Sequence, residues 1–441
     1  MDQNTTNQQQ RREARRKRRV RNQILAYITL ILFLDVLAGG IVFCVNFLTK
    51  QSRQNEQEKQ EQVDQMLSTE ESLTAPETES ATEETVPELT PEQKLDEIVN
   101  AGIEVMPLED KVAGLFVVIP ESITGVNTAV KAGNGTKDAL TKYSVGGIVY
   151  NTKNIQTEAQ FKEMISTTKL YANYPLFVAI EDEGGSVSPL EGKGLVAKQE
   201  GAVKLGEGGD ASKASEAGTA IGTYLADYGF NLDFAPVADL ANVDGSVMAK
   251  RAYGADADAV IPFVTAMVEG LEGQGVSACL KHFPGMGSTT QDTDKGLAST
   301  DRSAEDFRAN EFKVFQAGID AGADMILVSH MAAPALSGDN TPCSMSDKVV
   351  TDILRKELGF DGVIITDAMN ISAVTEYYGA DEAAVMALRA GCDMILMPEN
   401  FETAYNGVLE AVQNGVISED RINDSLRRVY RIKYADKIAE E

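Results

Sequence analysis

Tryptophan is absent from this 441-residue chain, and histidine occurs only twice. No His-x-His or His-Glu-x-x-His spacing is therefore present, which argues against the common zinc sites of hydrolases. Outside the apolar N-terminal run that holds Cys44, three cysteines remain. Their number is odd, and Cys279 and Cys392 lie within apolar runs, so we expect buried thiols and no disulfide framework.

Basic charge is also scarce in this chain. The net charge is −27 and the pI is near 4.5. A nucleic-acid-binding protein needs a basic face, so we expect no nucleic-acid partner. The positive charge that is present is concentrated in residues 1–22, which contain eight Arg or Lys against two acidic residues.

One long apolar run follows directly, over residues 23–48. A helix of this length spans roughly 38 Å, which is enough to cross a bilayer with some tilt. The preceding basic residues predict a cytoplasmic tail (1–22) and place the rest of the chain outside the cell membrane. A cleaved signal peptide is the alternative, but the run is too long and no Ala-x-Ala-like site follows it. We expect an uncleaved signal anchor, in which the mid-span Asp35 leaves helix association and the oligomeric state open.

Residues 49–91 are rich in Gln, Glu, Ser and Thr and almost free of aromatic clusters. Such a segment cannot bury enough apolar surface to fold, so we expect a disordered acidic linker. As a random coil it would hold the following domain roughly 35–40 Å from the membrane on average.

The pattern changes over residues 92–436, where short apolar runs alternate with helical patterns. The runs are 115–119, 145–150, 176–180, 230–237, 276–283, 325–330, 362–367 and 394–397. The helical patterns between them include 210–228, 256–272, 303–321, 346–358 and 381–390, with Ser303 and Ser346 as expected N-terminal caps. Eight strand–helix units in about 340 residues predict a closed parallel (β/α)8 TIM-type barrel. A doubly wound open sheet is the alternative, but no Gly-x-Gly-x-x-Gly opens a helix after the first strand.

Active sites of such barrels form at the C-terminal ends of the strands. Polar residues gather at five of the expected ends, namely Glu181, Asp182, Glu183, Asp239, Lys250, Arg251, Lys281, His282, His330 and Asp367. The loop after the fifth run passes through prolines and glycines to two further acids, Asp292 and Asp294. Their joint placement predicts a catalytic site at this mouth.

A carboxylate fixed on a strand and a second one on a loop suit glycoside hydrolysis. A retaining glycosidase needs a nucleophilic carboxylate and a proton donor about 5–5.5 Å from it. Asp367 is the candidate nucleophile, and Arg251 and Lys281 can donate hydrogen bonds to sugar hydroxyls. A metal site from His282, His330 and Asp367 is one alternative, and a Schiff base at Lys281 is another. The many acids around Lys281 favour a charged, substrate-binding role for it.

Four motifs resemble the N-terminal barrel of family 3 glycoside hydrolases, and within that family the bacterial β-N-acetylglucosaminidases. They are EDEGG at 181–185, KRAYG at 250–254, KHFPG at 281–285 and ITDAM at 365–369, in the family's order. The resemblance covers residues 92–436. It implies a carbohydrate substrate, retention through a glycosyl ester of Asp367, and no cofactor or metal. It also implies that Arg251, Lys281 and His282 bind the non-reducing sugar. Glu181, at the first acidic position of its motif, is expected to bind the same sugar.

The chain departs from the family's pattern at several positions. The loop histidine that donates the proton in the N-acetylglucosaminidase branch, in an Asp-[Ser/Thr]-His motif, is Asp294 here, and the second histidine of the Pro-Gly-His-Gly turn is Met286. In the strand-three motif, Glu181 replaces the first aspartate, and Ser186 and Pro189 replace two arginines.

Two hypotheses about function follow from these departures. In the first, Asp294 takes over as acid/base, and crowding by Asp292 keeps one of the two carboxyls protonated near neutral pH. In the second, hydrolysis is lost or weakened, and the barrel is a membrane-tethered glycan-binding or regulatory module. Retention of Asp367 favours the first, and loss of the donor histidine and both arginines favours the second.

Overall fold

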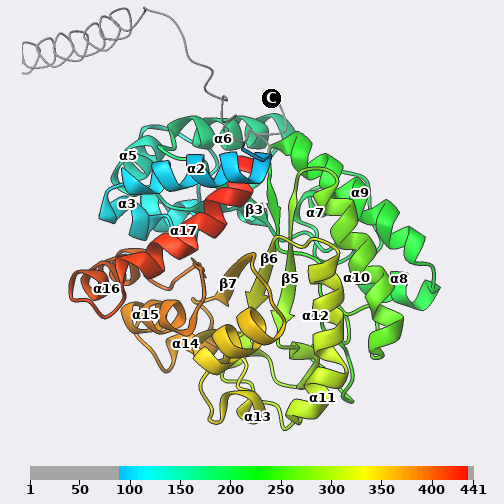
Figure 1. The fold of residues 1–441 in the computed structure, drawn as a ribbon. Coiled ribbons are helices and arrows are strands. Elements are labelled where there is room, and N and C mark those ends of the chain that lie inside the picture. Colours follow the sequence, from blue (N-terminus) through cyan, green and yellow to red (C-terminus); the bar gives the residue numbers. More distant parts are fainter. Residues whose placement is uncertain (1–88, 436–441) are drawn as a thin grey trace, which may run out of the picture. The chain divides into compact units, whose positions relative to one another are not determined.

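The computed structural model describes residues 89–435 of the chain (Figure 1). Eight parallel strands form a closed barrel, in which each strand pairs with the next and the last pairs with the first. They are β1 (Phe116–Val118), β2 (Gly147–Val149), β3 (Phe177–Ile180), β4 (Leu232–Asp233), β5 (Ser277–Phe283), β6 (Met325–Val328), β7 (Val363–Ala368) and β8 (Met394–Leu396). The predicted eight-stranded barrel is confirmed, and each strand lies within its apolar run except β7, which extends one residue past it.

Helices surround the barrel and connect its strands (Figure 1). The first half contains α2 (Pro91–Glu104), α3 (Leu108–Ala113), α4 (Pro120–Thr124), α5 (Asn134–Lys142), α6 (Glu158–Tyr171), α7 (Pro189–Gly192), α8 (Ala202–Gly208), α9 (Ala211–Tyr228) and α10 (Ala257–Glu272). The second half contains α11 (Ala304–Ala309), α12 (Glu311–Asp320), α13 (Pro334–Ser337), η5 (Lys348–Glu357), α14 (Ser372–Thr375), α15 (Ala380–Ala390), α16 (Phe401–Gln413) and α17 (Glu419–Tyr434). Short 3-10 turns occur at η1 (Thr152–Asn154), η2 (Met286–Ser288), η3 (Thr293–Lys295) and η4 (Cys343–Met345).

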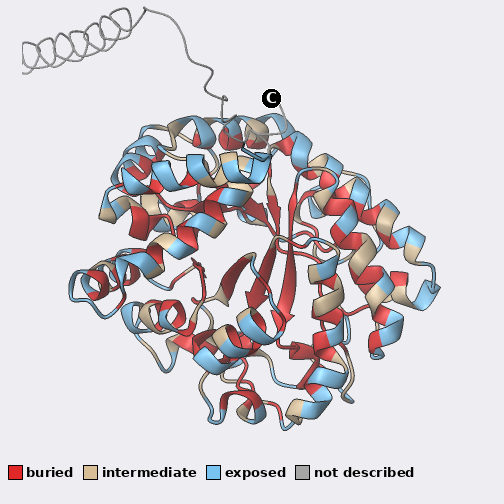
Figure 2. Cartoon of the chain, in the orientation of Figure 1, coloured by how far each residue is buried: buried red, intermediate tan, exposed pale blue. Residues whose placement is uncertain are grey.

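The strands are buried on both faces, as the red barrel interior in Figure 2 shows. Side chains such as Val117, Phe177 and Ile365 form a cluster inside the barrel, while a larger cluster lies between strands and helices. Two-sided burial is why the strands appear in the sequence as continuous apolar runs without polar alternation. Cys279, Cys343 and Cys392 are buried free thiols, as expected.

Two local predictions on the outer layer are wrong. The helix expected over residues 303–321 is broken at Asn310, whose φ of −128° and ψ of −80° separate α11 from α12. The break allows Glu311 to turn inward, where it is fully buried and accepts hydrogen bonds from Asn242 and Arg302. Ser303 does cap α11, by accepting a hydrogen bond from the Asp306 amide, but the side chain that caps η5 is Asp347 and not Ser346.

The predictions for residues 1–22, 23–48 and most of 49–91 fall outside the described residues. Within residues 89–435, no helix combines the length and apolar character that a membrane span requires. The described chain starts just before α2, which a capping box at Thr90 and Gln93 begins. Helix α2 then packs against the last helix, where Arg427 donates a hydrogen bond to Asn100 and Arg431 pairs with Asp96.

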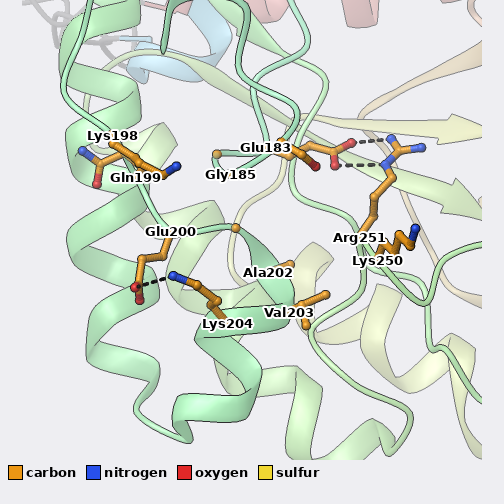
Figure 3. Close-up of a pocket in the computed structure, with 13 residues that line it drawn as sticks. Glu183, Gly185, Lys198, Gln199, Glu200, Ala202, Val203, Lys204, Lys250 and Arg251 are labelled. Atoms are coloured by element: carbon orange, nitrogen blue, oxygen red, sulfur yellow. Dashed lines mark hydrogen bonds and ion pairs between the residues drawn. The ribbon is translucent and has the colours of Figure 1, made fainter. Parts of the chain in front are cut away.

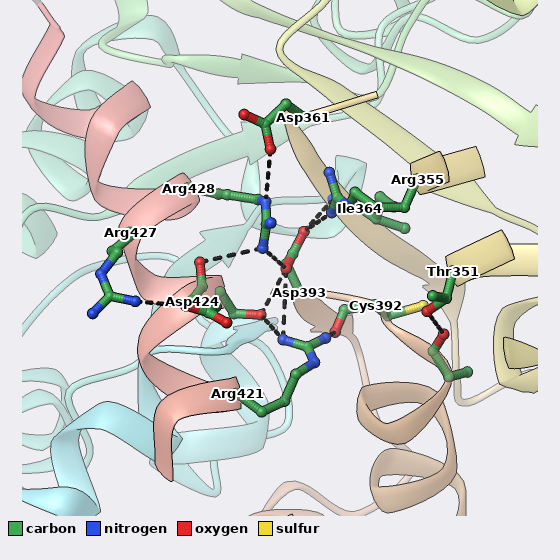
Figure 4. A network of polar contacts seen from close by, with 12 residues as sticks. Thr351, Arg355, Asp361, Ile364, Cys392, Asp393, Arg421, Asp424, Arg427 and Arg428 are labelled. Carbon is green, nitrogen blue, oxygen red and sulfur yellow. Dashed lines mark hydrogen bonds and ion pairs between the residues drawn. The ribbon is translucent and has the colours of Figure 1, made fainter. Parts of the chain in front are cut away.

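A buried carboxylate links the C-terminal helix α17 to the barrel. Asp393, directly before β8, is fully buried and forms ion pairs with three arginines, which are Arg355 of η5 and Arg421 and Arg428 of α17 (Figure 4). It also accepts hydrogen bonds from the Ile364 amide, at 3.0 Å, and the Ser425 hydroxyl, at 2.7 Å. Because Asp393 pairs with arginines of both α17 and η5, we expect its loss to loosen both helices.

We predict that Asp393→Ala lowers the free energy of unfolding by about 3–5 kcal/mol, because it removes the buried carboxylate that three arginines share. Denaturant unfolding of the variant measures this. The matched control is Asp361→Ala, since Asp361 pairs with Arg428 at 3.4 Å but its side chain is 87% exposed. The control should change stability by less than about 0.5 kcal/mol. Equal effects of the two substitutions would contradict the structural role given to Asp393.

Candidate active site

The C-terminal strand ends bring together the residues that the sequence singled out. Glu181 directly follows β3, and Asp367 lies near the end of β7. Lys281 and His282 lie in the last part of β5. Arg251 lies in the loop between β4 and α10, and its side chain reaches back to the acids that follow β3.

A cluster of four charged residues occupies one side of the mouth. The Lys281 ammonium lies 2.6 Å from a carboxylate oxygen of Glu181 and 2.7 Å from one of Glu183. The Arg251 guanidinium donates to Glu181 at 3.0 Å and makes two hydrogen bonds with Glu183 (Figure 3). We call Glu181, Glu183, Arg251 and Lys281 the ion cluster. It presents a rigid set of charges from three consecutive strand ends.

The ion cluster fixes its own charge states. The Lys281 side chain is only 1% exposed, and this burial lowers its pKa, but the Glu181 and Glu183 carboxylates outweigh it and raise the pKa overall. Burial acts against ionisation of Glu183 too, yet Lys281 and Arg251 bring its pKa down to about 2. Lys281 is therefore an ammonium without a nucleophilic lone pair, which disfavours the Schiff-base alternative.

His282 is held by an aspartate in the loop that follows the neighbouring strand β4. Its Nδ1 lies 2.7 Å from Asp239 Oδ2, and its backbone amide donates to the same oxygen at 3.2 Å. Both side chains are buried. A histidine oriented in this way presents its remaining ring nitrogen, Nε2, as the atom that can contact a ligand.

Asp367 and His330 lie close together at the ends of β7 and β6. One Asp367 carboxylate oxygen accepts a hydrogen bond from the Ala368 amide at 2.7 Å, which orients the side chain. His330 is fully buried, and its Nδ1 lies 2.7 Å from the Ser344 hydroxyl. Burial lowers the pKa of His330 despite the opposing effect of the Asp367 carboxylate, so the imidazole is neutral. Among residues 89–435, no three His, Cys, Asp or Glu side chains are placed to hold a metal ion.

The loop after β5 carries the second acid toward this mouth. Asp294 lies in η3 and is exposed, and its amide donates to the Asp292 carboxylate at 3.0 Å. Asp292 also pairs with Lys295 at 2.9 Å, which lowers its pKa. Partial burial and the Asp292 and Asp367 carboxylates raise the pKa of Asp294. The two loop acids therefore differ in acidity, and Asp294 is the one that holds its proton more tightly.

A second polar network lies behind the ion cluster. Asp182 is fully buried and accepts hydrogen bonds from the Ser188 and Tyr224 hydroxyls, both at 2.9 Å. Its amide donates to Asp233 of β4 at 2.8 Å. Burial raises the pKa of Asp182 to about 6 and that of Asp233 well above its usual range. This network fixes the turn after β3 and with it the positions of Glu181 and Glu183.

Sequence reasoning missed the roles of two residues. Glu183 joins Arg251 to Lys281, and Asp239 orients His282. Both acids lie at predicted strand ends, so their position was visible, but their partners are far along the chain. Of the family departures, Met286 is buried in η2, Pro189 begins α7, and Ser186 lines an open cavity beside Glu183.

Two proteins with sequences similar to this chain are named beta-hexosaminidases. The chain is 27% identical over 326 residues to beta-hexosaminidase A of Pseudoalteromonas piscicida, covering 67% of this chain and 54% of that protein. It is 31% identical over 286 residues to the beta-hexosaminidase of Stenotrophomonas maltophilia strain K279a, covering 62% of this chain and 82% of that protein. The chain thus spans about half the length of the first relative and most of the second.

Solved structures show the same barrel. A glycoside hydrolase family 3 beta-N-acetylglucosaminidase from Paenibacillus sp. strain FPU-7 superimposes with a TM-score of 0.72 at 34% identity, covering 76% of this chain and 64% of that one. A beta-N-acetylhexosaminidase from Beutenbergia cavernae superimposes with a TM-score of 0.66 at 28% identity, covering 74% of this chain and 98% of that one. Residues 107–432 match the sequence pattern of the glycosyl hydrolase family 3 N terminal domain. With its closed barrel and strand-end site, the chain belongs to glycosyl hydrolase family 3.

Proposed function

We propose that this protein is a retaining glycoside hydrolase that releases terminal β-linked N-acetylglucosamine, or a related hexose, from glycans. The observation that carries the proposal is the convergence of two acids, Asp367 on β7 and Asp294 on the facing loop, whose charges act on each other. Family membership and relatives named beta-hexosaminidase support the reaction and the sugar.

In the proposed reaction, a carboxylate oxygen of Asp367 attacks the anomeric carbon and forms a glycosyl ester. Asp294 transfers its proton to the glycosidic oxygen as the bond to the leaving sugar breaks. Asp294 then takes a proton from water, whose oxygen attacks the anomeric carbon and releases Asp367. Asp292 acts on Asp294 through its negative charge, and neither a metal nor an organic cofactor is needed.

The non-reducing sugar is proposed to lie against the ion cluster and His282. The exposed part of Glu181, whose side chain is 48% accessible, can accept hydrogen bonds from sugar hydroxyls. Arg251 and Lys281 offer donors from the same side of the mouth, and the Nε2 atom of His282, whose Nδ1 bonds to Asp239, offers an acceptor. Because these groups are already held by one another, little ordering is needed when the sugar binds.

A second function is a glycan-binding or regulatory module with weak or lost hydrolysis. It is favoured by the exposed position of Asp294 and by Ser186 and Pro189, which take the places of two family arginines. The two functions share the ion cluster and differ in whether Asp294 transfers a proton, so the experiments below separate them.

The domain arrangement is part of the proposal. A tail (1–22) in the cytoplasm, a membrane anchor (23–48) and an acidic linker (49–91) would hold the barrel (92–436) outside the cell membrane. The support is the basic cluster, the apolar run and the composition described above. Such a barrel would act on cell-surface or exogenous glycans.

The acid/base role of Asp294 is tested by kinetics on a β-N-acetylglucosaminide with a sugar leaving group. Asp294→Ala should lower kcat/KM by about 10²–10⁴-fold, because general acid catalysis is lost. The loss should shrink on an aryl glycoside, whose leaving group needs no proton. Asp367→Asn should abolish turnover of both substrates.

Three other results are informative. Unchanged turnover of both substrates in Asp294→Ala would contradict the donor role. If the wild type is inactive and Asp294→His is active, the site has lost its proton donor while the rest of the catalytic site is still competent. An inactive wild type that still binds N-acetylglucosamine oligomers would support the binding module.

The pH dependence of hydrolysis tests the proposed effect of Asp292. The negative charge of Asp292 raises the pKa of Asp294, and the acid must be protonated to act. Asp292→Asn should therefore lower the pKa of Asp294 and move the alkaline limb of the kcat/KM profile to lower pH. Asp301→Asn, an exposed acid further along the same segment, is the control and should leave the profile in place. A shift to higher pH in Asp292→Asn would contradict the proposal.

Membrane attachment is tested by cell fractionation. The full chain should sediment with membranes and resist extraction by high salt, since an apolar span is not held by charge. Deletion of residues 1–48 should leave the barrel in the soluble fraction. Neutral substitution of the basic residues in 1–22 is the control for charge-mediated attachment. Salt-extractable full-length protein would rule out the anchor.

A further inference from the structure

A cavity of about 590 Å³ opens beside the ion cluster (Figure 3). This volume lies in the range of small-molecule binding sites. Its walls come from the turn after β3, the segment that leads into α8, and the loop after β4, with residues Glu183–Ser186, Lys198–Lys204, Lys250 and Arg251. Of these residues, only Glu183 and Arg251 take part in the site described above.

The cavity lies on the side of the mouth opposite the proposed nucleophile. In the closed barrel, three strands separate β3 from β7 in either direction, so the ends of these two strands face each other across the mouth. Asp367 lies near the end of β7, whereas the lining comes from the segments after β3 and β4. Within residues 89–435, neither β7 nor the donor loop after β5 contributes to the lining.

A sugar in the proposed site extends across the mouth toward this cavity. Its anomeric carbon lies at Asp367, where the glycosyl ester forms, and the leaving sugar is attached to that same carbon. Its other end lies against the ion cluster. Arg251 donates a hydrogen bond to Glu181 at 3.0 Å on the mouth side and also lines the cavity, as does Glu183. The cavity therefore continues the site beyond the non-reducing end of the sugar.

The walls of the cavity are fixed before a ligand arrives. Gly185 has a φ of +61°, and a Cβ added to it would lie 2.8 Å from the Gly201 Cα, so the two walls meet closely there. The Gly185 amide also donates to the Gln199 carbonyl at 3.1 Å. Ser186, which stands where the family's pattern has an arginine, lines the cavity with a short side chain and leaves its space open.

Three lysines give the cavity a positive lining. The Lys198 and Lys204 side chains are 75% and 70% exposed, and their partners Glu191 and Glu200 lie at 3.5 and 3.7 Å. Exposed pairs at this distance contribute little and yield readily to a ligand. Lys250 is exposed, and its side chain makes no ion pair or hydrogen bond with other residues of 89–435. In Figure 3, Lys198 and Lys250 lie on opposite sides of the cavity.

The acids of the lining do not cancel these cations. Glu183 is neutralised by Arg251 and Lys281, and Glu200 is the one other carboxylate in the lining. Lysines gathered in a concave site raise the local concentration of anions. An ester of sulfate or phosphate suits such a lining, because its free oxygens can accept hydrogen bonds from ammonium groups on different sides.

We propose that this cavity binds a sulfate or phosphate ester at O6 of the non-reducing sugar, so that the substrate class is glycans that end in a 6-O-sulfated or 6-O-phosphorylated N-acetylglucosamine. The proposal rests on the proposed hydrolase function and adds a substrate class to it. O6 is the expected position because C6 lies outside the sugar ring, remote from C1, and carries its substituent past the ion cluster. Lys198 and Lys250 hold the ester from opposite sides, and Lys204 contributes at the rim.

The test compares three ligands that lack a leaving sugar, namely methyl β-N-acetylglucosaminide, its 6-sulfate and its 6-phosphate. Binding is measured by calorimetry on the full-length Asp367→Asn variant, which avoids turnover. At least one ester should bind about tenfold more tightly than the unsubstituted glycoside, as expected for two exposed ion pairs, and salt should reduce this preference. The tighter ester identifies the group that the cavity accepts. Equal binding of all three ligands would overturn the proposal.

Variants locate the preference within the cavity. In the Asp367→Asn background, Lys198→Gln with Lys250→Gln should remove the tenfold difference between the ester and the unsubstituted glycoside. Lys193→Gln is the matched control, since Lys193 is exposed on the same segment but does not line the cavity. A preference that persists in the double variant, or that disappears in the control, would contradict the assignment to this cavity.

Two further measurements test the cavity and the proposed reaction separately. Inorganic sulfate or phosphate that binds as tightly as its ester, and competes with it, would show a free-anion site and overturn the proposal. Hydrolysis of the aryl β-N-acetylglucosaminide and its 6-esters by the wild type is measured in parallel. Absence of hydrolysis would contradict the proposed function alone, because the binding difference and its loss in the double variant still decide whether the cavity binds the ester.

Discussion

The mouth of the barrel depends on one interaction, which is the burial of the Lys281 ammonium between the carboxylates of Glu181 and Glu183. A buried ammonium is costly unless it is paired, and removing one partner of such a pair leaves the other charge uncompensated. Arg251 joins the same two carboxylates, so no member can move without disturbing the others. The interaction thereby fixes the strand ends of β3 and β5 and the loop after β4 relative to one another.

The barrel was predictable because its strands are buried on both faces, which leaves an apolar run for each of them in the sequence. The positions of Glu181, Lys281 and Asp367 followed from the rule that strand ends carry the site. The predictions that failed concern local structure that is decided by contacts with residues elsewhere in the sequence. Asn310 breaks a helix so that Glu311 can meet Arg302 and Asn242, and no helical periodicity reports that contact.

The same distinction applies to the site. Glu183 and Asp239 were visible as acids near strand ends, but their functions lie in pairings across 98 and 43 residues of sequence, with Lys281 and His282. Crowding predicts that one of Asp292 and Asp294 stays protonated, but it does not predict which of them keeps the proton. That depends on Lys295, which pairs with Asp292 and stabilises its anion.

An aspartate in the donor position creates a requirement that a histidine does not. A carboxylic acid becomes an anion after it gives up its proton, and Asp367 and Asp292 make that anion costly. Arg251 opposes them by stabilising the Asp294 carboxylate, although it also belongs to the ion cluster proposed to hold the sugar. A neutral sugar that bonds to Arg251 leaves this charge in place, but it displaces water from around Asp294, and the added desolvation disfavours the anion and raises the pKa of Asp294 further. Substrate binding and donor protonation would thus be linked through desolvation of the donor, so that the acid holds its proton most firmly when a sugar is in place.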